Sequence, residues 1–296
     1  LINPLKFSNP ARPLVLLAYD TRDSSPHLAE LTKRAILDLG GVCVDYTLAT
    51  TPQLHYYVGL TNDRATQALG PAASAAAASV CDSTVALALP RDYTTLFEAY
   101  ITLSQTASAK DAENDTEAKD SSGLSSFAVA VDCANGIGAA ALRAFLDYTT
   151  AKTSTEPSIC HSDHWTVFND PFAPENAGCR VNDGCGAEFV QKSRKLPANT
   201  PSIHPNNNDT NSEDVIYASF DGDCDRLVCF LTNNASPASP LTLIDGDKIA
   251  LLLVTTLRMW LETAGLSHLS LGLVQTPYAN GASTRAAAAQ SVSVLF

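Results

Sequence analysis

The sequence predicts an α/β protein in which mixed or parallel sheets are sandwiched by helices. Three observations lead to this class: apolar runs of strand length recur along the chain, amphipathic helical stretches alternate with them, and glycine or proline marks many boundaries. The chain has 296 residues, of which 45% are hydrophobic and 17% charged. At about 150 residues per domain, this length predicts two domains, each able to bury its own core.

The first elements form a strand–helix–strand unit. Residues 14–19 are an apolar run of strand length. In the helix that follows, Ser25 is predicted as the N-cap and Pro26 as the first helical residue. Two glycines at 40–41 end this helix, and residues 42–46 return as a strand. We expect the two strands to pair in parallel, because a helix connects them.

The rest of the chain continues the alternation. A second helix begins at Thr51 and Pro52, while the Ala-rich stretch 70–89 fits either a helix or an insertion. Residues 104–126 are rich in Ser, Thr, Ala, Asp, Glu and Lys and are interpreted as a linker or surface loop. Further strands are predicted at 127–131, 215–220, 227–231, 271–275 and 291–296, and helices at 136–145, 248–261 and 283–290.

Charge and hydropathy exclude several classes of function. The chain has 19 Lys and Arg residues and 31 Asp and Glu residues, which gives a net charge of −12. This negative charge disfavours binding to nucleic acids and to membrane surfaces. The most apolar stretch, 249–257, has less than half of the roughly 20 residues that span a bilayer, and we expect a buried helix there. Residues 1–10 show no basic start followed by an apolar core, so a cytoplasmic location is predicted. The eight cysteines form no CxxC pair, which argues against a zinc ribbon.

The strongest chemical signal is the acidic loop Asp221–Arg226 between two apolar strands. Asp221, Asp223 and Asp225 alternate on a short turn, where their charges repel one another unless a cation lies among them. Mg²⁺ prefers such oxygen ligands and leaves coordination positions for a phosphate. Gly222 permits the sharp bend, and Arg226 offers a fork of donors to a phosphate. The alternative is a solvated acidic hairpin tip.

Two other ligand sites fit this sequence less well. An EF-hand that began at Asp221 would have Arg226 in place of its glycine and Thr232 in place of its last glutamate. The GxGxxG/A spacing at Gly136 and Gly138 is typical of dinucleotide binding, but four residues separate the first glycine from the strand. We interpret these glycines as the start of a helix that packs closely on its sheet.

The loop of residues 20–25 follows a strand and precedes a helix, which is where open α/β sheets bind ligands. Its Arg22 is therefore a candidate phosphate ligand. An ion-paired capped turn is the alternative interpretation, and the sequence favours it. The segment 278–284 has the same placement and the same alternatives.

Together these segments resemble the α-D-phosphohexomutase superfamily, whose metal-binding signature DGDxDR is present from Asp221 to Arg226. The subgroup that the chain resembles is the phosphoacetylglucosamine mutases. The supporting segments occur in the family's order: YDTRDSS (19–25), TTPQLHY (50–56), DCANGIGA (132–139), NDGCGAEFV (182–190), IDGDKIA (244–250) and QTPYANGASTR (275–285).

The resemblance implies repeated phosphohexomutase-type α/β/α domains. Residues 1–125 would be the C-terminal part of domain I, with an insertion or linker at about 104–126. Residues 127–265 would be domain II with the metal-binding loop, and residues 266–296 the start of domain III. The domains that follow in the family, with its sugar-recognition and phosphate-binding loops, are expected beyond Phe296.

The resemblance also implies a reaction. Asp221, Asp223 and Asp225 would bind Mg²⁺, and Arg226 and Arg22 would contact the sugar phosphate. The family interconverts N-acetylglucosamine 6-phosphate and 1-phosphate through a phosphoserine enzyme and a 1,6-bisphosphate, in UDP-N-acetylglucosamine biosynthesis. Its phosphoserine loop is expected upstream, so no catalytic residue is assigned here and this chain alone is expected to be inactive. A silent paralogue or fragment that only binds Mg²⁺ or a sugar phosphate is the alternative.

Overall fold

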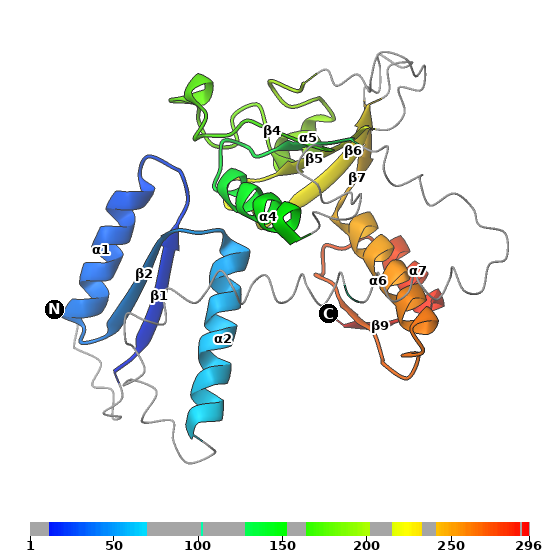
Figure 1. Cartoon of the computed structure of the whole chain (residues 1–296), viewed down its shortest axis with the longest axis horizontal. Coiled ribbons are helices and arrows are strands. Elements are labelled where there is room, and N and C mark those ends of the chain that lie inside the picture. Colours follow the sequence, from blue (N-terminus) through cyan, green and yellow to red (C-terminus); the bar gives the residue numbers. More distant parts are fainter. Residues whose placement is uncertain are drawn as a thin grey trace. The chain divides into compact units, whose positions relative to one another are not determined.

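The computed structural model describes residues 12–69, 102, 128–152, 164–201, 215–232, 241–290 and 292–295. The chain divides into two compact units, Leu1–Thr94 and Thr95–Phe296, which are drawn in Figure 1. The Ala-rich stretch 70–89 and the predicted linker 104–126 lie outside the described residues. The predicted domain boundaries stay a prediction.

The first unit contains the predicted strand–helix–strand arrangement. Its elements are β1 (Leu14–Tyr19), α1 (Ser25–Asp38), β2 (Val42–Leu48) and α2 (Thr51–Leu69). β1 and β2 pair in parallel, with Leu14 opposite Val42, which confirms the predicted pairing. The polar loop 20–25 therefore lies at the carboxyl end of β1, before the first turn of α1.

The predicted N-cap of α1 is wrong by one residue. Ser24 is the N-cap, and Ser25 is the first residue of the helix. The Ser25 hydroxyl donates a hydrogen bond to Asp20 Oδ1 at 2.6 Å, across the loop. The sequence pattern predicted that the Ser25 hydroxyl caps the helix. In the structure this hydroxyl is instead hydrogen-bonded to the buried carboxylate of Asp20.

The second unit is built on one mixed five-stranded sheet with the order β4–β3–β5–β6–β7. β3, β4 and β5 run parallel, whereas β5–β6 and β6–β7 are antiparallel. Its strands are β3 (Ala128–Asp132), β4 (Trp165–Phe168), β5 (Val215–Phe220), β6 (Leu227–Thr232) and β7 (Leu241–Ile244). The carboxyl ends of the three parallel strands meet at one edge, where the loops that follow them converge.

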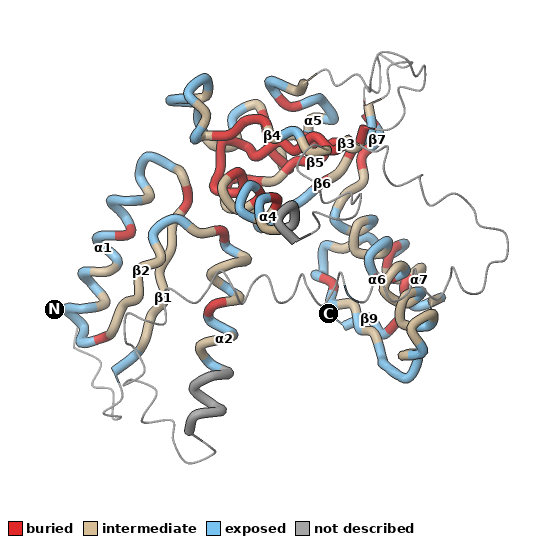
Figure 2. The backbone as a smooth tube through the Cα atoms, in the orientation of Figure 1, coloured by how far each residue is buried: buried red, intermediate tan, exposed pale blue. Residues whose placement is uncertain are grey.

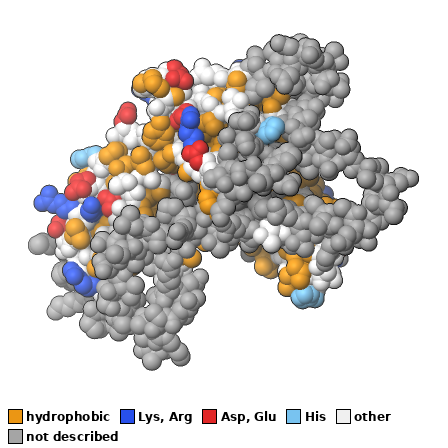
Figure 3. All heavy atoms as spheres, in the orientation of Figure 1, with side chains coloured by type: hydrophobic (Ala, Val, Ile, Leu, Met, Phe, Trp, Pro, Cys, Tyr) orange, Lys and Arg blue, Asp and Glu red, His pale blue; other side chains and the backbone are white. Residues whose placement is uncertain are grey.

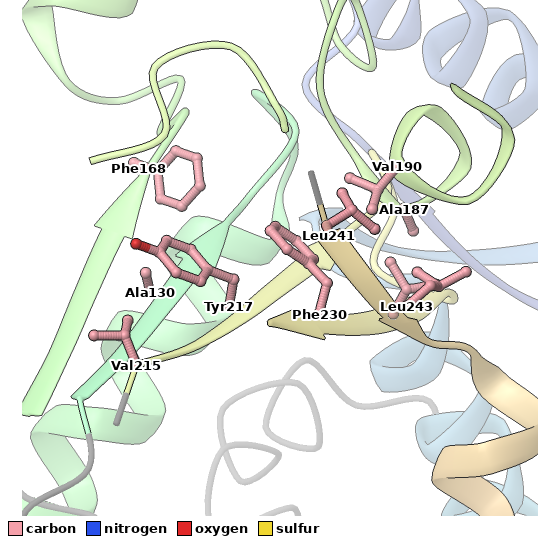
Figure 4. Packing of buried hydrophobic residues seen from close by; sticks show 10 residues of the cluster. Ala130, Phe168, Ala187, Val190, Val215, Tyr217, Phe230, Leu241 and Leu243 are labelled. Carbon is pink, nitrogen blue, oxygen red and sulfur yellow. The ribbon is translucent and has the colours of Figure 1, made fainter. Parts of the chain in front are cut away.

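Helices cover both faces of this sheet. Val129 and Val131 of β3 pack with α4 (Gly138–Lys152), while Ala130 between them faces the cluster that contains α5 (Ala187–Ser193). Figure 4 shows the second cluster, in which the rings of Tyr217 and Phe230 stack with centroids 5.4 Å apart. Buried residues concentrate in this sheet and its adjoining loops (Figure 2). The sandwich predicted from the sequence is confirmed.

The last elements are α6 (Gly246–Thr263), β8 (Gly272–Val274), α7 (Gly281–Ala289) and β9 (Ser293–Leu295), with β8 and β9 parallel. The prediction of a buried helix at 249–257 is wrong. Val254 is the buried residue of α6, and Leu252 and Leu253 are 59% and 49% exposed. The small cluster with Ala287 and Val292 covers only one stripe of this helix.

Exposed apolar side chains reach the surface elsewhere in the described parts as well (Figure 3). Among the described residues, none of the helices combines the length and the apolar character needed to cross a membrane. The predicted cytoplasmic location stays a prediction.

Candidate metal centre

The acidic loop connects β5 to β6 at the sheet edge where the parallel strands end. The pair Phe220 and Leu227 closes the antiparallel ladder just before it. Within the loop, the N–H of Cys224 donates to the carbonyl of Asp221 at 3.1 Å, and Cys224 takes a left-handed conformation with φ +62°. This tight reversal turns the alternating carboxylates toward one another.

The three carboxylates converge as the sequence predicted. One oxygen from each of Asp221, Asp223 and Asp225 lies within 4.8 Å of the others. Asp221 is 2% exposed, Asp223 is half-buried and Asp225 is exposed, so the group opens from the protein interior to solvent. This separation suits a shared divalent cation, and the role of the three residues as ligands is taken up below as a proposal.

Asp221 is the structural centre of the loop. Its Oδ1 accepts hydrogen bonds from the N–H groups of Asp225 at 3.1 Å and Arg226 at 3.0 Å. Its Oδ2 accepts from Arg226 Nε at 2.8 Å. Burial raises the pKa of Asp221, but the hydrogen bonds from Arg226 outweigh it and the pKa lies below its ordinary value. The carboxylate is therefore ionised at neutral pH.

Asp225 has the opposite shift. Its pKa is raised, first by partial burial and then by repulsion from Asp221 and Asp223, while Arg226 partly compensates. The loop thus concentrates negative charge that one arginine does not neutralise, and a divalent cation would relieve the repulsion.

Two glycines allow the acidic loop to lie against the turn that opens α4. A Cβ on Gly136 would stand 2.3 Å from the carbonyl oxygen of Gly222, and the N–H of Ile137 donates to that oxygen at 3.0 Å. A Cβ on Gly138 would lie 3.1 Å from the ring of Phe220. The GxGxxG-like spacing therefore serves close packing, which confirms our interpretation of these glycines.

A fully buried carboxylate, Asp132, holds together the loops around the site. It accepts hydrogen bonds from the N–H groups of Ala134 at 2.9 Å and Gly186 at 2.7 Å. The side chains of Asn169 and Ser219 donate to it at 2.8 and 2.9 Å. Burial raises its pKa more than these four hydrogen bonds lower it. Asp132 lies within the motif DCANGIGA, but this role could not be predicted from the sequence, because three of its four partners are far away along the chain.

Glu188 is a second residue near the site that the sequence analysis did not single out. It lies in the first turn of α5, and its Oε2 accepts a hydrogen bond from Arg226 Nη1 at 3.1 Å. Lys192, one turn further along α5, also donates to Glu188. The salt bridges with Lys192 and then with Arg226 keep the pKa of Glu188 below its ordinary value. The motif NDGCGAEFV contained this residue, but its partner lies 38 positions away.

Arg22 lies in the first unit, in the ion-paired turn that the sequence favoured. Its Nη1 is 2.6 Å from Asp20 Oδ2, and its N–H donates to Asp20 Oδ1 at 3.2 Å. Its side chain is 53% exposed. The two units are described separately, so a phosphate-binding role for Arg22 stays a prediction.

Comparison with known proteins gives consistent matches. The sequence profile described as phosphoacetylglucosamine mutase AMG1, domain III, matches residues 245–295. Phosphoacetylglucosamine mutase 1 of Schizosaccharomyces pombe is 35% identical over 274 residues, covering 92% of this chain and 43% of that protein. The human phosphoacetylglucosamine mutase is 34% identical over 271 residues, covering 92% of this chain and 40% of the human protein.

Solved structures agree with the sequence matches. An N-acetylglucosamine-phosphate mutase of the α-D-phosphohexomutase superfamily, in its apo-form, aligns with a TM-score of 0.56 and 26% identity, over 96% of this chain and 44% of that one. The Aspergillus fumigatus N-acetylphosphoglucosamine mutase in complex with GlcNAc-6P and magnesium aligns with a TM-score of 0.57 and 25% identity. The alignment covers 98% of this chain and 47% of the Aspergillus chain.

The fold and the acidic loop, with these matches, point to one class of protein: the chain is similar to members of the α-D-phosphohexomutase superfamily. Within this superfamily it is similar to the phosphoacetylglucosamine mutases. The chain spans 40% to 43% of the length of the curated relatives named above. The activity of a whole mutase is therefore treated as a proposal.

Proposed function

We propose that this chain is the Mg²⁺-binding part of a phosphoacetylglucosamine mutase, with Asp221, Asp223 and Asp225 as the metal ligands. The observation that carries the proposal is the convergence of three carboxylate oxygens within 4.8 Å of one another around the buried Asp221. An all-oxygen donor set fits Mg²⁺, which keeps several coordination positions for water and phosphate. When bound, the ion would neutralise charge on a transferring phosphoryl group.

The proposed reaction interconverts N-acetylglucosamine 6-phosphate and N-acetylglucosamine 1-phosphate. The matched Aspergillus fumigatus enzyme was solved with GlcNAc-6P and magnesium, which supports this substrate class and this ion. Arg226 contributes a guanidinium group at the rim of the acidic loop, with its side chain 49% exposed, where it can contact a phosphate. Phosphoryl transfer depends mainly on such positioning and charge neutralisation.

The phosphoserine that carries the phosphoryl group is not assigned to any residue of this chain. The chain by itself is therefore proposed to bind Mg²⁺ without turning over substrate. A protein that only binds Mg²⁺ or a sugar phosphate is distinguished from a mutase segment by activity measurements on the complete reading frame.

Calorimetric titration of the purified chain with MgCl₂ tests the metal site. We expect one Mg²⁺ per chain in the wild type, and loss of measurable binding in Asp223→Ala. Asp147→Asn is the matched control, since it removes an exposed acidic side chain on α4 and should leave binding unchanged. Equal heats for wild type and Asp223→Ala would overturn the proposed site. Turnover of N-acetylglucosamine 6-phosphate by this chain alone would overturn the proposal that the nucleophile lies elsewhere.

A further inference from the structure

We propose that Glu188 is a positioning residue that keeps Arg226 beside the acidic loop when Mg²⁺ occupies it. This inference rests on the proposed Mg²⁺ site and adds a residue of α5 to it. Glu188 acts through the guanidinium of Arg226, to which it is hydrogen-bonded.

Arg226 is held by two carboxylates from different segments of the chain. Its Nε donates to Asp221 Oδ2 at 2.8 Å, and its Nη1 donates to Glu188 Oε2 at 3.1 Å. A third carboxylate, Asp225, is more distant, with its Oδ1 at 3.7 Å from Nε. Two different nitrogens of the planar guanidinium are thus fixed from two sides, which sets its plane as well as its position.

A metal ion in the loop would weaken the first of these two anchors. Two backbone N–H groups already occupy Asp221 Oδ1. Arg226 already pairs with Asp221 Oδ2, so Arg226 and a metal ion would compete for the charge of this carboxylate. A divalent cation held by Asp221 would repel the guanidinium, because both are positive. Glu188 then becomes the anchor that remains.

The backbone around Glu188 is suited to hold this anchor in place. Gly186, which precedes α5 with φ +89°, donates its N–H to the buried Asp132 at 2.7 Å. Ala187 and Val190 on either side of Glu188 are 1% and 0% exposed and pack in the sheet's core. The side chain of Glu188 nevertheless reaches the rim, where it is 45% exposed.

Without Glu188, the charge of Arg226 would be available to the carboxylates of the loop. The guanidinium would pair more closely with Asp221 and Asp225 and compete with Mg²⁺ for them. Removing Glu188 should therefore weaken Mg²⁺ binding, and removing Arg226 should strengthen it. In a chain without Arg226, the loss of Glu188 should have little further effect, and this dependence separates positioning from a direct effect of charge.

A double-mutant cycle measures this dependence by calorimetric titration with MgCl₂ at low ionic strength. For a pair at the rim, we expect Glu188→Gln to raise the Kd for Mg²⁺ about threefold. Arg226→Gln should lower it about threefold by the same reasoning. In the Arg226→Gln background, Glu188→Gln should change the Kd by less than about 1.5-fold. Glu188→Asp, which keeps the charge, should restore part of the wild-type affinity.

Glu262→Gln is the matched control for the cycle. Glu262 accepts a hydrogen bond from Arg258 at 2.8 Å on α6, and its side chain is 52% exposed. This variant removes a carboxylate of similar exposure and pairing, and its Kd for Mg²⁺ should equal that of the wild type. An equal effect of Glu188→Gln with and without Arg226 would overturn the inference, as would no effect in either background.

A second measurement separates this inference from the proposed function. In metal-free chain, the Nε–H of Arg226 donates to Asp221, and its NMR resonance should move to lower field in Glu188→Gln, because the guanidinium then pairs more closely with Asp221. A wild type that binds no Mg²⁺ would overturn the proposed function whatever this signal shows. A resonance at the same position in both proteins would overturn the anchoring role of Glu188 even if Mg²⁺ binds.

Discussion

Replacing Asp132 by Asn tests whether one buried carboxylate holds the loops of the second unit together. The carboxylate receives four hydrogen bonds, two of them from the backbone N–H groups of Ala134 and Gly186. An amide of the same shape offers only one oxygen. If the amide oxygen occupies the position of Oδ1, it still accepts from Ala134 and Asn169. The new NH₂ group then occupies the position of Oδ2 and faces two other donors, the Gly186 N–H and the Ser219 hydroxyl. The hydroxyl can rotate to accept, whereas the Gly186 N–H cannot.

The expected cost follows from these contacts. A buried N–H left without an acceptor costs about 1–3 kcal/mol. The other hydrogen bonds lose their charge-assisted character, which costs about 1 kcal/mol more. The neutral amide is easier to bury than the carboxylate, whose pKa burial raises, and this offsets part of the loss. We expect Asp132→Asn to lower the free energy of unfolding by about 2–3 kcal/mol in total.

Urea unfolding at pH 7, followed by tryptophan fluorescence, measures this change in the second unit. The two tryptophans of the chain, Trp165 and Trp260, both belong to that unit, and Trp165 pairs with β3. Ser219→Ala is the comparison variant, because it removes one donor and leaves the carboxylate three, with an expected loss of about 1 kcal/mol. If Asp132→Asn unfolds within about 0.5 kcal/mol of the wild type at an unchanged slope, the reasoning is refuted.

Three further predictions concern the site and its core. Gly136→Ala would put a Cβ 2.3 Å from the Gly222 carbonyl oxygen, so calorimetry should show Mg²⁺ binding weakened about tenfold or more. Gly246→Ala, which meets no atom within 4 Å, should bind Mg²⁺ normally, and equal affinities for the two variants would contradict the steric argument. Phe230→Ala removes a fully buried ring and should lower the free energy of unfolding by about 3–5 kcal/mol in urea titrations, with a loss below about 1 kcal/mol speaking against the packing described. The raised pKa of Asp225 means that protons compete with Mg²⁺ at a higher pH than for an ordinary aspartate. Mg²⁺ affinity measured from pH 7.5 downward should therefore be highest at neutral pH and fall as the pH approaches that raised pKa. An affinity that stays constant down to pH 4, where an ordinary aspartate is already about half protonated, would count against Asp225 as a ligand.

Several elements of the fold were missed by the sequence analysis for identifiable reasons. β4 and β7 have four residues each, too short for a periodic pattern. α5 has seven residues, and it follows a segment dominated by turn residues. These short elements form because the sheet provides partners: β4 pairs along β3, β7 pairs along β6, and α5 packs on the core. Tertiary contacts therefore decided structure where the local pattern was weak.

The candidate site shows the same division. Asp221, Asp223, Asp225 and Arg226 lie within six consecutive residues, so their proximity is local and could be predicted. Glu188 reaches Arg226 from a segment 38 positions away. The position of Glu188 depends on Gly186, whose N–H is hydrogen-bonded to Asp132, 54 positions away in the sequence. Pattern and spacing carry no information about such pairs until the sheet brings the segments together.

The sequence by itself determined the α/β class, most of the longer helices and strands, and an acidic turn whose charges call for a cation. These depend on periodicity and on neighbours along the chain, which are visible in the order of residues. Three features were decided only by the tertiary structure. Hydrogen bonds to Asp132 connect four segments of the chain, the backbone of Gly222 lies where a side chain on Gly136 would be, and Glu188 pairs with Arg226. The physical reason is that burial and long-range hydrogen bonding depend on distances in space, which are set when the parallel strands align.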